Sequence, residues 1–223
     1  MILALKREDY AHYFLFDKRL FFLVLCGINL LVGYVSSEFV LTKEVYYQTY
    51  GEQVAIERID KYLELRESFS WIGYLFIPII LFVKMSYTAV CLNIGTVFAG
   101  LRIGFGKLFK IALIAESIFI IAAISRSGWL LFILDVSVLE DVQYFYPLSL
   151  LNLFEPGSLE RWFIYPVHTL NLFELVYWLV LALGLSWVLK EGYDKMLRLV
   201  LSTYGIGLLI WMVFVVFLSL NLS

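Results

Sequence analysis

Five stretches of the sequence are too apolar to form the surface of a water-soluble domain. They cover residues 20–36, 71–99, 108–125, 163–189 and 199–220. About 20 mostly apolar residues in a helix cross a bilayer core about 30 Å thick, and each stretch is near or above that length. The sequence therefore predicts an all-α integral membrane protein, with one transmembrane domain over residues 1–223 built as a bundle of five helices.

Composition agrees with this class and excludes others. Hydrophobic residues make up 62% of the chain, well above the 45–50% of a typical soluble domain. The lipid bilayer is therefore the expected partner. The net charge of −2 argues against a nucleic-acid partner. Cys26 and Cys91 both lie inside apolar stretches, which argues against a structural disulfide or a zinc site.

The second stretch, 71–99, can be interpreted in two ways because Lys84 interrupts it. As one helix it would be about 43 Å long, so it would have to tilt, protrude or bend. As two spans it would give segments of about 13 and 17 residues, short against the usual 17–25. We favour one long span, with Pro78 as the natural kink point.

The longest polar segment, 37–68, follows the first span. Within it, Val54, Ile56, Ile59 and Leu63 recur at helical spacing. This pattern predicts an external amphipathic helix over 52–67 that lies on the membrane surface, with its apolar side chains facing membrane or protein.

Basic residues are distributed unevenly between the two sets of loops that five spans would create. Eleven of the 17 Lys and Arg residues fall on the side of the N-terminus, and the loops of the other side are rich in Asp and Glu. Because cytoplasmic loops carry the excess of Lys and Arg, we expect a cytoplasmic N-terminus and an external C-terminus. The expected location is a bacterial cytoplasmic membrane.

Three ionisable residues lie within the apolar stretches: Lys84, Glu116 and Glu174. His168 lies near the start of the fourth. A charge in the middle of a bilayer costs about 2.5–3.5 kcal/mol on insertion scales, so such residues usually face the bundle interior and are paired. They could form a proton or ion relay, or they could reach water and structural partners near the ends of the spans. We predict an ion pair between Lys84 and Glu116, which enter from the same side, and expect Glu174 at a different depth.

The familiar catalytic motifs are absent from the sequence. It contains no HExxH, no GxSxG, no P-loop and no pair of cysteines at metal-binding spacing. We therefore expect no enzymatic activity and no cofactor.

Two regions carry a family resemblance. A turn with Gly100, Gly104 and Phe105 precedes the third span; later, Asn171–Phe173 with Glu174 opens a span that ends in Leu183–Leu185. In these features the chain resembles the bacterial branch of the Yip superfamily, membrane proteins named for interacting with Ypt/Rab GTPases. The resemblance covers about residues 71–218 and implies five spans, a cytoplasmic N-terminus and no catalytic residues. The chain lacks the DLYGP-like motif of the eukaryotic proteins, so the resemblance implies no Rab partner.

Two functions remain open at this point. The missing catalytic motifs and the resemblance favour a non-enzymatic scaffold, assembly or membrane-organising subunit with a membrane-protein partner. The alternative is a transporter or permease subunit that uses Lys84, Glu116 and Glu174. Convergence of these charges on a cavity within the bundle would favour transport, and exposure to lipid would favour the scaffold.

Overall fold

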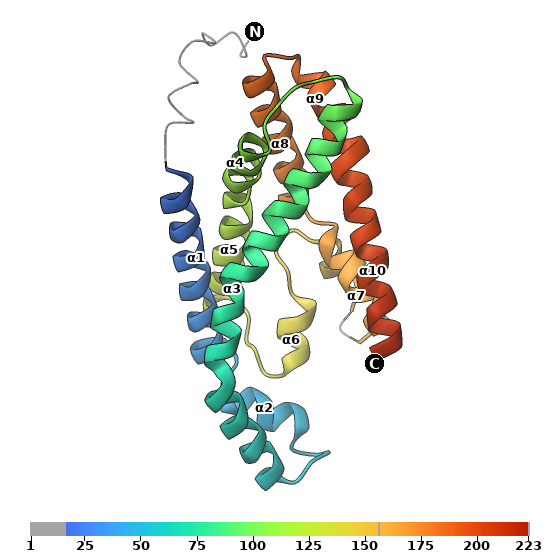
Figure 1. Cartoon of the computed structure of the whole chain (residues 1–223). Coiled ribbons are helices and arrows are strands. Elements are labelled where there is room, and N and C mark those ends of the chain that lie inside the picture. Colours follow the sequence, from blue (N-terminus) through green and yellow to red (C-terminus); the bar gives the residue numbers. More distant parts are fainter. Residues whose placement is uncertain (1–16, 156, 223) are drawn as a thin grey trace.

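The chain folds as an all-α bundle with five helices that are long and apolar enough to cross a membrane (Figure 1). The structure is a computed structural model, and it describes residues 17–155 and 157–222. The N-terminal residues that we predict to be cytoplasmic lie mostly outside this described part. The five spans are Lys18–Val40, Ile56–Phe98, Phe105–Phe132, Leu172–Leu189 and Tyr193–Asn221.

The second span is one uninterrupted helix, which confirms the interpretation of 71–99 as one long helix. This helix, α3 (Ile56–Phe98), contains Pro78 and has 43 residues, so it is about 65 Å long. A bilayer core is about 30 Å thick. The helix therefore extends well beyond the hydrocarbon, and it runs obliquely across the bundle in Figure 1.

Three other spans contain an irregular turn. In the first, α1 (Lys18–Val35) continues into the π-helical turn η2 (Ser36–Val40). In the third, α4 (Phe105–Ala115) and α5 (Ser117–Phe132) meet at Glu116, whose backbone carbonyl accepts from the N–H of Phe119, three residues ahead. In the fifth, α9 (Tyr193–Val200) passes through a second π-helical turn, η4 (Leu201–Gly205), into α10 (Ile206–Leu222).

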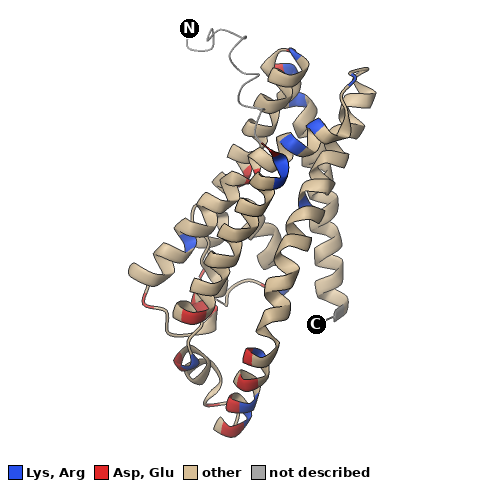
Figure 2. Cartoon of the chain, turned by 60° about the vertical axis from the view of Figure 1, so that its left-hand side comes forward, with Lys and Arg blue, Asp and Glu red and all other residues tan. Residues whose placement is uncertain are grey.

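Short helices gather in the half of the molecule that also holds the start of α3. They are α2 (Lys43–Tyr50), α6 (Leu139–Tyr144), the 3-10 turn η3 (Leu150–Leu153) and α7 (Arg161–Thr169). Figure 1 shows α2 and α6 in the lower half and α7 near the middle, with the α3–α4 and α8–α9 turns at the upper end. Figure 2 shows acidic residues concentrated near α2 and the first turns of α3.

The predicted fourth span, 163–189, is wrong at its start. Its first residues belong to α7, and the membrane-crossing helix is α8 (Leu172–Leu189). The break at 170–171 has two causes. The side chain of Asn171 caps α8 by accepting from the backbone N–H of Glu174, and the backbone around Leu170 pairs with that of Leu148 and Leu150.

The segment that we predict to be external also differs from the expectation. Residues from Ile56 onward are helical as predicted, but they form the first turns of α3 and not a separate helix on the membrane surface. Ile59 and Leu63 are buried against Tyr46 of α2, as expected for side chains that face protein, whereas Ile56 is exposed. The segment is thus the first part of a membrane-crossing helix, with its own small apolar core.

The third span continues past its predicted end at residue 125. Arg126 lies inside α5 and donates to two backbone carbonyls, those of Phe145 at 3.1 Å and Val142 at 2.7 Å. These acceptors come from the chain that follows α5, and they let a guanidinium remain within a helix where the sequence indicated a terminus.

Two larger apolar clusters hold the spans together. One joins α3, α4, α8, α9 and η4 around Leu92, Leu108 and Tyr177, and the other joins α1, α3, α4 and α5 around Leu25, Met85 and Leu113. Helices approach closely at Gly207 of α10, where an added Cβ would lie 2.6 Å from the Sγ of Cys91. Small residues at such crossings are typical of helix packing in membranes.

Candidate functional site

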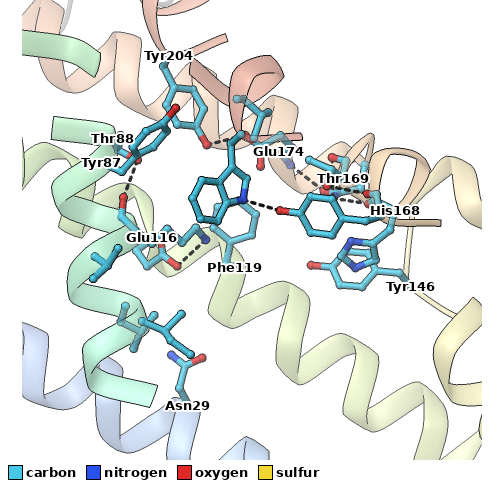
Figure 3. A pocket seen from close by; sticks show the side chains of 18 of the residues that line it. Asn29, Tyr87, Thr88, Glu116, Phe119, Tyr146, His168, Thr169, Glu174 and Tyr204 are labelled. Atoms are coloured by element: carbon cyan, nitrogen blue, oxygen red, sulfur yellow. Dashed lines mark hydrogen bonds and ion pairs between the residues drawn. The ribbon is translucent and has the colours of Figure 1, made fainter. Parts of the chain in front are cut away.

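The four residues singled out from the sequence line one pocket. Lys84, Glu116, His168 and Glu174 come from α3, the α4–α5 junction, α7 and α8, and the pocket between them has a volume of about 740 Å³. In Figure 3 the side chains of Glu116 and Asn29 lie on one side and those of His168 and Tyr146 on the other. Glu174, which we expected at a different depth from Glu116, therefore shares this pocket with it.

Lys84 and Glu116 form the ion pair that the sequence predicted. Lys84 Nζ lies 2.8 Å from Glu116 Oε1. The ammonium also lies 3.5 Å from the centre of the Phe119 ring, one turn beyond Glu116. Lys84 therefore points into the bundle and does not reach for the membrane surface. Its side chain is 38% exposed and that of Glu116 only 3%.

The second carboxylate oxygen of Glu116 has no hydrogen-bond partner. Oε2 is buried, and it is the one such side-chain atom found among the described residues. Buried polar atoms in proteins are nearly always hydrogen-bonded, and an exception in a pocket points to an occupant such as water, an ion or a ligand. The position of this atom is set by the irregular turn at the α4–α5 junction.

Glu174 is held by aromatic donors. Its Oε1 accepts from Trp178 Nε1 at 2.8 Å and from the Tyr204 hydroxyl at 2.9 Å. Its backbone N–H is bound by the side chain of Asn171 at 2.8 Å, at the N-terminus of α8. The positive end of the helix dipole and the cap by Asn171 together make this N-terminus a suitable place for a carboxylate.

Tyr204 reaches Glu174 from the π-helical turn η4. Single π-helical turns within α-helices often occur at functional sites. In this chain the turn carries Tyr204 into the pocket, while Thr203 on the same turn packs close to Gly95 of α3.

His168 lies between two tyrosines. Its ring centre is 4.2 Å from that of Tyr146 in an edge-on contact, and 6.4 Å from that of Tyr165 in a stacked one. Burial, and to a lesser degree the positive charge of Arg126, lower the pKa of His168 from 6.5 to about 4. Burial also raises the pKa of Tyr146, against the opposing effect of Arg126. His168 is therefore a neutral imidazole at pH 7.

Two polar contacts tie α10 to its neighbours beside the pocket. The Tyr87 hydroxyl of α3 donates to the backbone carbonyl of Gly207 at 2.7 Å. Trp211 Nε1 donates to the hydroxyl of Tyr165 of α7 at 2.9 Å. Hydrogen bonds between uncharged groups thus link α10 to α3 and to α7, two of the helices that line the pocket.

Sequence reasoning placed Asn171 at the start of a span but missed its role as a cap. It also missed Tyr204, which lines the pocket, and Arg126, which lies over the ring of Tyr146 outside the lining. The signal for Asn171 was present, because Asn followed three residues later by Glu is a typical helix start. The polar run around Tyr204 inside an apolar span was a weaker signal. Arg126 gave none, because its carbonyl acceptors lie far along the chain.

Among residues 17–155 and 157–222, no three His, Cys, Asp or Glu side chains gather in a way that could hold a metal ion. No family model, curated protein or solved structure matches this chain. The resemblance to the Yip superfamily accordingly stays a prediction, and the geometry of the pocket is the basis for assigning a function.

Proposed function

We propose that this protein is a transporter or permease-type subunit that binds its substrate in the pocket between α3, α7, α8 and α10. The observation that supports this most directly is the convergence of Lys84, Glu116 and Glu174 on one pocket, where Glu116 Oε2 has no protein partner. Intramembrane ionisable residues usually mark substrate or ion pathways.

The depth of the pocket supports the same assignment. Glu116 lies near the middle of the 28-residue span Phe105–Phe132, and Lys84 lies near the middle of the apolar part of α3. Transporters commonly bind substrate near the bilayer midplane, where irregular helix segments line the site. The α4–α5 junction and η4 are irregular segments of this kind.

The scaffold hypothesis, with an unidentified membrane-protein partner and no enzymatic activity, stays a prediction. It requires a surface for the partner, and the exposed apolar side chains of the spans are already accounted for by lipid. A scaffold function also does not explain why two carboxylates line one pocket. These considerations favour the transport function.

We also propose that the end with the α3–α4 and α8–α9 turns faces the cytoplasm of a bacterial cell. The excess of Lys and Arg on that side supports this orientation. The C-terminal end of α10 would then face the exterior.

Cysteine labelling tests the transport function. In a background with Cys26→Ala and Cys91→Ala, Leu208→Cys places a thiol on the pocket wall and Val213→Cys places one on the exposed face of α10. A small water-soluble maleimide should label the pocket thiol in intact proteoliposomes at least about tenfold faster, because thiols in hydrocarbon do not ionise. Equal, slow labelling of both would mean that the pocket is sealed from water, and the transport function would be wrong.

A further inference from the structure

The pocket is open on the flank of the bundle. Its α3 wall includes Ile79, Ile80 and Val83, which are 49%, 60% and 55% exposed. These residues lie in the middle of the apolar part of α3, so hydrocarbon and not water surrounds them. An occupant can therefore place an apolar group at this opening while a polar group reaches the interior.

The side chains that line the pocket carry a net negative charge. Lys84 is the cation of the lining, and Glu116 and Glu174 are its two carboxylates. Arg126 lies over the ring of Tyr146, outside the lining, and donates to two backbone carbonyls. The ion pairs found among the described residues are Lys84–Glu116 and Lys195–Glu191, and neither includes Glu174. Trp178 and Tyr204 both donate to Glu174 Oε1, and no hydrogen bond to its Oε2 is found in the described part of the chain.

Aromatic rings complete the wall on the Glu174 side. Tyr146, Tyr165, Tyr204 and Trp211 all line the pocket. Aromatic faces attract ammonium groups, most strongly where water is excluded. Lys84 demonstrates this preference within the same pocket, because its ammonium lies over the ring of Phe119.

From this charge and shape we infer that the substrate is an amphiphilic organic cation, a single ammonium or similar group attached to an apolar body, which binds at Glu174 and enters from the bilayer. One positive charge would balance the second carboxylate of the pocket lining. The apolar body would fill the opening beside Ile80 and Val83. This inference rests on the proposed transport function and specifies its substrate class.

The chemistry could be supplied by a free lipophilic amine or by the ammonium head group of a zwitterionic lipid. Both have a cationic nitrogen next to hydrocarbon. The phosphate that a lipid head group also carries would have to lie near Lys84, the one cation on the pocket wall among the described residues.

Binding of two ions of matched shape and opposite charge tests the inference. Radiolabelled tetraphenylphosphonium and tetraphenylborate would be titrated onto the full chain in nanodiscs of phosphatidylglycerol. We expect saturable binding of the cation only, weakened about tenfold or more by Glu174→Gln, because the attraction between the phosphonium and the carboxylate is lost. Glu191→Gln, which alters an ion pair outside the pocket, is the matched control and should bind normally.

Each other outcome has a defined meaning. Preference for the borate, or cation binding that Glu174→Gln leaves unchanged, would overturn the inference. Adding phosphatidylethanolamine to the nanodiscs separates the sources: competition with the phosphonium identifies a lipid head group, and no competition identifies a free amine. Fast labelling at Leu208→Cys without phosphonium binding would reject this substrate class alone and leave the transport function standing.

Discussion

Replacing either partner of the Lys84–Glu116 ion pair is expected to destabilise the bundle, by amounts that differ between the two. Lys84→Met leaves a carboxylate that is 3% exposed without its cation, and its Oε2 already lacks a donor. Removing one partner of a buried pair costs about 3–5 kcal/mol. Because the Lys84 side chain is 38% exposed, we place the loss near the lower limit, about 3 kcal/mol.

Glu116→Gln should cost less, about 1–2 kcal/mol. The amide keeps an oxygen within reach of Lys84 and removes a buried negative charge, while the ammonium keeps its contact with the ring of Phe119. The double variant removes both charges, so its loss should be smaller than the sum by about 1–2 kcal/mol.

Unfolding in mixed detergent micelles, followed by circular dichroism, gives the four free energies of this cycle. Glu191→Gln is the control, because the Lys195–Glu191 pair is partly exposed to solvent and should contribute less than about 1 kcal/mol. Strictly additive losses, or a Lys84→Met variant as stable as the control, would refute the reasoning that the pair is buried and coupled.

Three further predictions concern other parts of the molecule. Gly207→Ala should lower the free energy of unfolding by about 1–3 kcal/mol, since its Cβ would meet Cys91, whereas Gly73→Ala, with open space around it, should be neutral or stabilising in the same unfolding assay. Asn171→Ala should cost about 1 kcal/mol through the lost cap of α8, and Asn171→Asp should restore most of it. The pKa of His168 is about 4 in the folded protein and about 6.5 in the unfolded chain, so the unfolded chain binds a proton first as the pH falls. The free energy of unfolding should therefore be highest above about pH 6.5 and fall as the pH drops toward 4. His168→Phe should remove that part of the pH dependence of unfolding.

Hydropathy was sufficient for the number and order of the spans. The apolar stretches predicted five crossings, and the interpretation of 71–99 as one helix is confirmed by α3. These features depend on solvent and helix length, which are encoded locally. The cost of burying unpaired charge was also enough to predict the contact of Lys84 with Glu116.

Breaks within spans depend on contacts from distant parts of the chain. The split between α7 and α8 requires backbone pairing of Leu170 and Leu172 with residues near Ser149, which periodicity does not reveal. Arg126 remains inside α5 because carbonyls of Val142 and Phe145 accept its N–H groups. Such acceptors carry no side-chain signature, so the sequence indicated a helix end.

The pocket itself was beyond prediction for a related reason. Its residues come from α1, α3, the α4–α5 junction, α5, α7, α8, η4, α10 and the chain between α6 and η3, and their convergence is set by which helix faces meet. A π-helical turn such as η4 changes the helix face on which Tyr204 lies. Hydropathy does not reveal that change.

The length of α3 has a mechanical consequence. One continuous helix joins the small apolar core around Ile59 to the pocket at Lys84. Pro78 lies between them and interrupts the hydrogen bonding of the helix, because proline has no backbone N–H to donate to the carbonyl of Tyr74. Ile59 lies about 28 Å along the helix from Pro78. A bend of about 10° at that proline would move the core around Ile59 by about 5 Å. A movement of that core can therefore be coupled through α3 to the pocket.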